Sequence, residues 1–158
     1  MKYDKVRKTP SQLLSLTGFT PEEFEAFVPT FEHHWNEYYS HFTLKGQPRQ
    51  RISYNRKSSQ LPLVGDKLLF ILSYLKNNPL QEYHGATYGM TQPQCNEWVH
   101  RLSEILLKSL KTLEELPDRN HFRVKYLSGQ CRDVLLDGTE RPVERPRDPD
   151  RQKLRYSG

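Results

Sequence analysis

The strongest constraint on the fold is one amphipathic segment between residues 20 and 42. It opens with Thr20-Pro21-Glu22-Glu23, in which Thr20 can cap a helix and Glu23 can complete a capping box. Aromatic residues then recur at the three- and four-residue spacing of one helix face: Phe24, Phe27, Phe31, Trp35, Tyr38 and Phe42. Pro29 lacks the N–H that a helix interior needs, so we expect it to kink or split the helix. The segment predicts a long helix with an aromatic face.

Helix signals dominate the chain as far as about residue 116, which predicts a mainly α fold. Thr9-Pro10 and Gly18 bound a short apolar helix, and residues 1–44 are interpreted as N-terminal helices. A dense apolar helix follows from Leu63 to Lys76, where Asn77-Asn78-Pro79 ends it. Its dense apolar composition predicts that it is central to the core.

Residues 45–62 differ in composition and are interpreted as a basic, mobile linker. Glycine, serine and proline lie among basic residues, and the stretch from 43 to 62 contains no acid. Four of its basic residues are candidate DNA contacts: Arg49, Arg51, Arg56 and Lys57.

Residues 63–116 predict a helix-turn-helix. A short helix from Leu80 to Tyr88 meets Gly89, and Thr91 then caps a second helix with Gln94 three residues later. We expect Gly85 and Ala86 to lie where the two helices approach closely, and Gly89 to adopt a positive φ. Four residues are expected to pack the helices together: Tyr88, Met90, Cys95 and Trp98.

The exposed face of the second helix predicts contacts with duplex DNA, because amide side chains pair with adenine edges and arginine reaches guanine or phosphate. The candidate residues there are Gln92, Gln94, Asn96, His100 and Arg101. A net charge of +5, from 24 basic and 19 acidic residues, agrees with a polyanionic partner. The alternative is an ordinary helical hairpin with a hydrated polar face.

Several other functions are disfavoured by the residues present. Cys95 and Cys131 form no metal-binding or nucleophile pattern, and no apolar run approaches the roughly 20 residues that span a bilayer. We therefore expect a soluble intracellular protein without a membrane partner. His33, Glu37 and His41 share a helix face that could bind a metal, but we interpret it as a solvated polar face.

Residues 117–158 change in character and predict a strand that opens toward a hairpin. Val134-Leu135-Leu136 is a short apolar run that ends at Asp137-Gly138. A carboxylate at the end of a buried strand is costly unless it is hydrogen-bonded or coordinates a cation. Asp-Gly is also a common hairpin turn, and on spacing alone the turn is favoured.

Taken together, the sequence resembles the N-terminal part of bacterial insertion-sequence transposases of the insertion-sequence-five type. The resemblance rests on four stretches: Lys67 to Lys76, Tyr88-Gly89-Met90-Thr91-Gln92, Trp98-Val99-His100-Arg101-Leu102 and Asp137-Gly138-Thr139-Glu140-Arg141-Pro142. It implies a helix-turn-helix followed by a ribonuclease H-like α/β domain of the DDE type. In that domain, three acids hold two divalent cations, usually Mg²⁺, that cut and join DNA strands. It makes Asp137 the first catalytic acid and metal ligand.

The resemblance also implies terminal inverted repeats as the DNA partner and a bacterial, nucleoid-associated location in the cytoplasm. The sequence stops at Gly158, 21 residues after Asp137, before the other two acids. We therefore expect residues 117–158 to be a truncated start of the catalytic domain, which binds no Mg²⁺ stably and is inactive alone. A homodimer, or association with the missing catalytic half, is possible on this view. Two alternatives remain: a helical module that dimerises through the aromatic stripe, and a stand-alone helix-turn-helix regulator.

Overall fold

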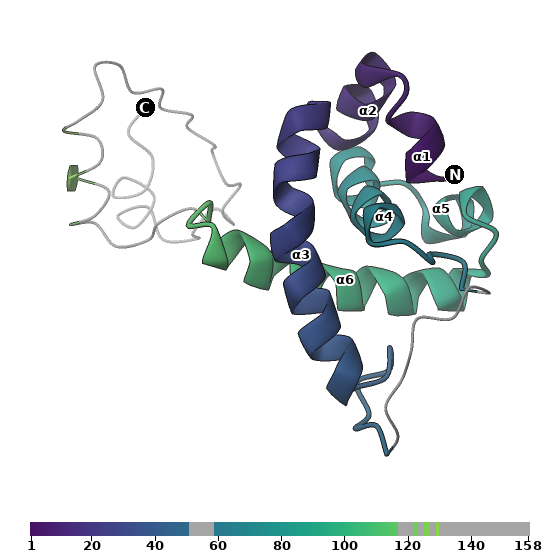
Figure 1. Ribbon diagram of the computed structural model, residues 1–158. Helices are drawn as coiled ribbons and strands as arrows, with labels where there is room; N and C mark the ends of the chain where they lie inside the picture. Colours follow the sequence, from purple (N-terminus) through teal and green to yellow (C-terminus); the bar gives the residue numbers. More distant parts are fainter. Residues whose placement is uncertain (51–58, 117–121, 123–124, 127–128, 130–158) are drawn as a thin grey trace, which may run out of the picture. The chain divides into compact units, whose positions relative to one another are not determined.

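Helices account for the regular structure of the part of the chain that the computed structural model describes. That part is residues 1–50 and 59–116, with residues 122, 125, 126 and 129. Its helices are α1 Tyr3–Val6, α2 Pro10–Thr17, α3 Pro21–His41, α4 Val64–Asn77, α5 Gln81–Thr87 and α6 Gln92–Thr112 (Figure 1). The mainly helical prediction is confirmed for these residues, which include no β-strand. The predicted strand and hairpin around Asp137 lie outside the described residues.

The chain divides into two compact units, Met1–Pro117 and Asp118–Gly158. The helices on either side of the predicted linker belong to the same first unit, and the rest of the description concerns that unit. None of the described helices combines the length and apolar character needed to cross a membrane.

Local capping signals set the helix boundaries. At the start of α3 the Glu23 N–H donates to Thr20 Oγ1 (3.3 Å), and the Thr20 N–H donates to the Glu23 carboxylate (2.8 Å). At the start of α6 the Thr91 N–H donates to Gln94 Oε1 at 3.0 Å. Gly18 ends α2 with a φ of +84°. These predicted boundaries are confirmed.

Pro29 lies inside α3 without splitting it. The helix runs from Pro21 to His41 as one element, so of the two expected effects of Pro29, a kink or a split, the split does not occur (Figure 1). A proline in a helix interior costs about 3 kcal/mol because one hydrogen bond is lost. Burial of a large apolar side chain returns about 1.5–3 kcal/mol, and α3 buries Phe24 and Phe27 before the proline and Phe31 and Trp35 after it. Packing on both sides of Pro29 therefore keeps the helix continuous.

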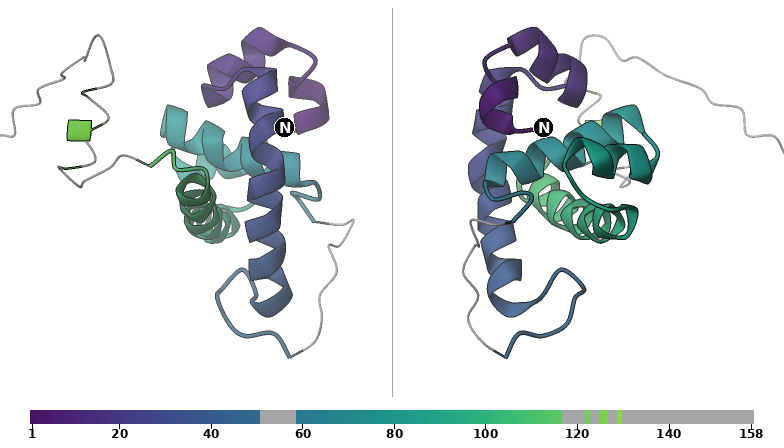
Figure 2. Two further views of the ribbon diagram at one scale, coloured as in Figure 1. Left: turned by 60° about the vertical axis from the view of Figure 1, so that its left-hand side comes forward. Right: turned by 90° about the vertical axis from the view of Figure 1, so that its right-hand side faces the viewer.

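The core forms where α3 crosses α4 and α6 (Figure 2). On α4, the stretch from Leu68 to Ile71 has no exposed surface, as expected for a central helix. From α3, the Trp35 ring stacks on Trp98 of α6, with ring centroids 5.7 Å apart. Most of the aromatic stripe is thus buried within one chain, since the side chains of four of its residues are at most 4% exposed, namely Phe24, Phe27, Phe31 and Trp35. This burial leaves those four side chains unavailable to the alternative dimer face.

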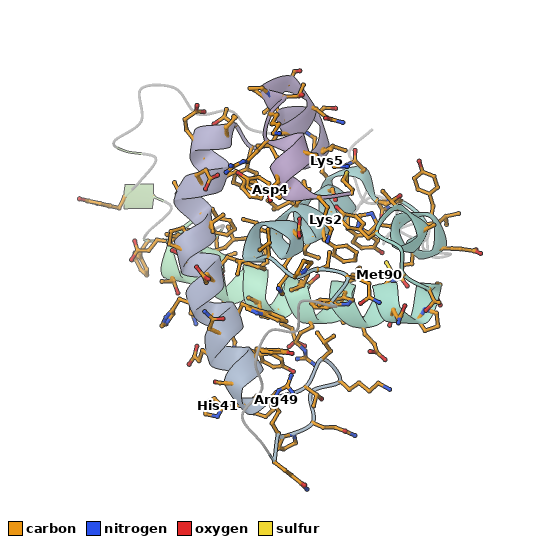
Figure 3. The ribbon with its side chains drawn as sticks, turned by 45° about the vertical axis from the view of Figure 1, so that its right-hand side comes forward. Lys2, Asp4, Lys5, His41, Arg49 and Met90 are labelled. Atoms are coloured by element: carbon orange, nitrogen blue, oxygen red, sulfur yellow. The ribbon has the colours of Figure 1, made fainter. Side chains whose placement is uncertain are left out.

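The first part of the predicted linker is ordered. Phe42 and Pro48 form an antiparallel bridge, and the Thr43 N–H donates to the Gln47 carbonyl at 2.9 Å. The Arg49 N–H donates to the His41 carbonyl (2.8 Å), which returns the chain to the end of α3 (Figure 3). We call residues 42–49 the 42–49 hairpin. The expectation of a mobile linker is therefore wrong for these residues.

Candidate nucleic-acid interface

A close approach of α5 to α6 builds the helix-turn-helix. A Cβ atom on Gly85 would lie 3.0 Å from the Met90 carbonyl oxygen and 3.2 Å from Cys95 Cβ, so glycine suits this position. Gly89 has the expected positive φ of +71°. Ala86 is exposed, so the expectation that it lies at the helix contact is wrong. The residues predicted to pack the two helices are buried, namely Tyr88, Met90, Cys95 and Trp98.

Two polar side chains fix α5 onto α4. His84 is buried, and its Nε2 lies 3.1 Å from the Phe70 carbonyl oxygen. Burial lowers the pKa of His84, which favours the neutral ring. The Tyr88 hydroxyl lies 3.2 Å from Ser73 Oγ, and burial raises the pKa of Tyr88. Sequence reasoning missed both hydrogen bonds, because no spacing rule links these residues to α4.

Four of the nine side chains predicted to contact DNA lie on the first turns of α6, three of them exposed and Asn96 half-buried. Gln92 Nε2 and Asn96 Nδ2 both donate to Gln81 Oε1 of α5, at 2.9 and 3.1 Å. This shared acceptor holds both amides at the same edge of α6, and sequence reasoning did not single out Gln81. His100 is exposed one turn further along. Gln94 is exposed but its carbonyl oxygen is engaged in the cap with Thr91.

Arg101 is engaged within the protein. Its guanidinium lies over the Tyr38 ring, 4.5 Å from the centroid, and its Nε donates to the Leu44 carbonyl at 3.2 Å. It also forms an ion pair with Glu104, and its side chain is 15% exposed. A guanidinium with these partners is poorly placed to reach a base, so the structure points to a role inside the fold.

The basic residues predicted in the linker fall into two groups. Arg49 is half-buried, with its guanidinium 4.2 Å from the centroid of the Tyr39 ring and its Nε donating to the Phe42 carbonyl (Figure 3). Arg51, Arg56 and Lys57 lie outside the described residues, as do Asp137 and Cys131. Their predicted roles stay predictions.

The histidines of α3 group differently from the predicted set. The candidate donor atoms of His33, His34 and Glu37 lie within 4.8 Å of one another. His41 does not belong to this group. His34 Nε2 lies 2.8 Å from Thr112 Oγ1, so one ring nitrogen links α3 to the end of α6. His33 and Glu37 are exposed, which agrees with the interpretation as a polar face.

Comparison with known proteins identifies the same three helices. Residues 60–112 match the family model "Helix-turn-helix of DDE superfamily endonuclease". The matched range contains all of α4, α5 and α6. It supports a DNA-binding helix-turn-helix from the N-terminal region of a DDE-type transposase. Neither the curated proteins nor the solved structures contain a match.

Proposed function

We propose that the protein binds duplex DNA by placing the first turns of α6 in the major groove. The observation that carries the proposal is the match of α4–α6 to a helix-turn-helix of DDE endonucleases, together with the exposed polar start of α6. In helix-turn-helix proteins the second helix enters the groove with its N-terminal residues at the base edges. Here those positions carry Gln92, Asn96 and His100.

Among these residues, the two amides are suited to base readout. Each amide donates one N–H to Gln81 and makes no other side-chain hydrogen bond within the described part of the chain, which leaves its second N–H and its carbonyl oxygen for a base. One free donor and one free acceptor match the N7 acceptor and N6 donor of adenine. We assign base contacts to Asn96 and Gln92, and an additional contact to His100.

We further propose a role at the ends of an insertion sequence of the insertion-sequence-five type, with terminal inverted repeats as the DNA. On this proposal residues 117–158 begin the catalytic domain, and Asp137 is its first acid and Mg²⁺ ligand. Asp137 lies outside the described residues. The DNA binding proposed for α6 does not require Asp137 or Mg²⁺.

The test is fluorescence anisotropy with labelled duplexes from the DNA flanking the gene, and with unrelated duplexes as competitors. We expect binding at about 50 mM salt. The logarithm of the association constant should fall linearly with the logarithm of the salt concentration. Asn96→Ala and His100→Ala should each weaken binding to the preferred duplex by about 1–3 kcal/mol, or roughly 5- to 150-fold. Binding to unrelated duplexes should change little.

The matched control is Gln12→Ala, which removes an exposed amide from α2 and should leave the affinity unchanged. No binding at low salt would overturn the proposal. Equal losses for preferred and unrelated duplexes would contradict the assigned base contacts. Flanking DNA that competes no better than unrelated DNA would contradict the role at element ends.

A further inference from the structure

The 42–49 hairpin is fixed against α6 by a small set of specific contacts. Arg101 of α6 donates to the Leu44 carbonyl, and Tyr38 of α3 donates its hydroxyl proton to the Thr43 carbonyl at 2.7 Å. Gly46 closes against the same arginine, because a Cβ there would lie 2.9 Å from Arg101 Nη2. Gly46 also has a φ of +79°, a conformation that favours glycine. The hairpin therefore packs against α6 in one defined position.

The hairpin contacts α6 at one edge of the exposed face of that helix. Successive residues of a helix are about 100° apart, so Asn96 and Glu97 lie toward opposite edges with His100 between them. The Asn96 edge meets α5 through Gln81. The Glu97 edge meets the hairpin through Lys45, whose Nζ is 3.5 Å from the Glu97 carboxylate. A duplex that receives the face around His100 is thus flanked by α5 on one side and by the hairpin on the other.

The charge of the hairpin suits a polyanion. Residues 42–49 contain Lys45 and Arg49 and no acid. The Lys45 side chain is 68% exposed. The two acids of α6 are Glu97 and Glu104, which pair with Lys45 and Arg101. Because an exposed ion pair contributes only about 0–1 kcal/mol, Lys45 can exchange Glu97 for a phosphate at small cost.

We propose that the 42–49 hairpin is a second DNA-contacting element, which follows the phosphate backbone beside the groove that α6 enters. Lys45 contacts a phosphate, and Arg101 is a positioning residue that holds the hairpin in place. This inference rests on the proposed function. It assigns the hairpin affinity and orientation without sequence readout, since phosphate contacts position a protein on the duplex and base contacts specify the sequence.

The test compares Lys45→Ala, Glu97→Gln and the double variant in the full chain, on an unrelated duplex across a salt series. Loss of one phosphate contact should reduce the slope of log affinity against log salt by about 0.9, and weaken binding about tenfold near 50 mM salt. Glu97→Gln alone should strengthen binding. Lys5→Ala is the matched control, because Lys5 is an exposed lysine of α1, far from the hairpin in Figure 3.

The double variant separates contact from charge masking. If Lys45 contacts a phosphate, Lys45→Ala/Glu97→Gln keeps the reduced slope. If Lys45 only neutralises Glu97, the double variant returns to the affinity and slope of the wild type, and the inference is overturned. If the wild type binds DNA and the Lys45→Ala variant has the same salt slope as the wild type, the role of the hairpin is overturned but the proposed function is not. A wild type that does not bind overturns the proposed function and the inference together.

Arg101→Met tests the positioning role. The variant should release the hairpin, so that hydrogen exchange of the Thr43 and Gly46 amides rises while α4 stays protected. In this background Lys45→Ala should cause no further change in slope, since the hairpin no longer presents Lys45. Fully additive losses from Arg101→Met and Lys45→Ala would show that Arg101 contacts DNA itself and would contradict the assignment.

Discussion

Replacement of Trp35 by alanine is expected to lower the free energy of unfolding by about 3–5 kcal/mol. Trp35 has no exposed surface and lies where α3 crosses α4 and α6. Its ring stacks on Trp98 and also on Tyr39, at centroid distances of 5.7 and 4.9 Å. Alanine leaves a cavity between three helices and removes the ring beneath the Lys67 ammonium, which lies 4.8 Å from its centroid. Urea unfolding followed by circular dichroism measures the loss.

Trp35→Phe is the matched control for this prediction. Trp35 Nε1 has no hydrogen-bond partner among the described residues, so phenylalanine removes volume without breaking a hydrogen bond. Its effect should be clearly smaller than that of alanine. A loss below about 1 kcal/mol for Trp35→Ala would contradict a core role, because such a loss is typical of surface positions. A wild-type midpoint that depends on protein concentration would instead favour the dimer alternative.

The features that could be predicted from sequence are those set by neighbouring residues. The capping boxes at Thr20 and Thr91 need only a partner three residues away, and the turn at Gly89 needs only its own backbone freedom. Helix periodicity likewise gathered Trp35 with the other aromatic residues on one helix face, but the burial of that face in the core became known only from the structure. These local signals located the helix-turn-helix that the family comparison supports.

Contacts between distant segments could not be predicted in this way. Arg101 was predicted to contact DNA from its place on α6 alone, and no neighbouring residue in the sequence indicates its partners within the fold. The Leu44 carbonyl that it binds is 57 residues earlier in the chain. For the same reason Gly46 and Pro48 indicated a linker, although one guanidinium and a few hydrogen bonds fix the 42–49 hairpin. The partners of Gln81 and His84 also come from other helices.

The burial of Lys67 is another feature that the local sequence pattern did not indicate. Lys67 lies in the apolar run of α4, and its charged side chain is buried, with the residue only 1% exposed. Its Nζ donates to the Leu61 carbonyl at 2.8 Å and lies 3.4 Å from the carbonyl oxygens of Pro62 and Leu63. These carbonyls and the Trp35 ring replace part of the hydration of the ammonium. The lysine thereby ties the segment before α4 to the core.

Stability should rise with pH between about 8 and 10 because of Lys67. Burial lowers its pKa from 10.5 to about 8, against smaller opposing effects of Asp66 and Glu32. Above pH 8 the folded state has lost this proton while the unfolded state still binds it. The free energy of unfolding then increases with pH, at up to about 1.4 kcal/mol per unit. Burial raises the pKa values of Cys95, Tyr3 and Tyr88, which opposes this rise once their unfolded forms ionise.

Comparison with Lys67→Met isolates the effect, since the other groups titrate equally in both proteins. The wild-type free energy of unfolding minus that of the variant should grow by about 2–3 kcal/mol from pH 8 to pH 10. Lys5→Met, at an exposed lysine, should give a difference that does not change with pH. A flat difference for Lys67→Met would mean that the three carbonyls and the Trp35 ring compensate the lost hydration fully. In that case the ammonium would be no less stable in the core than in water.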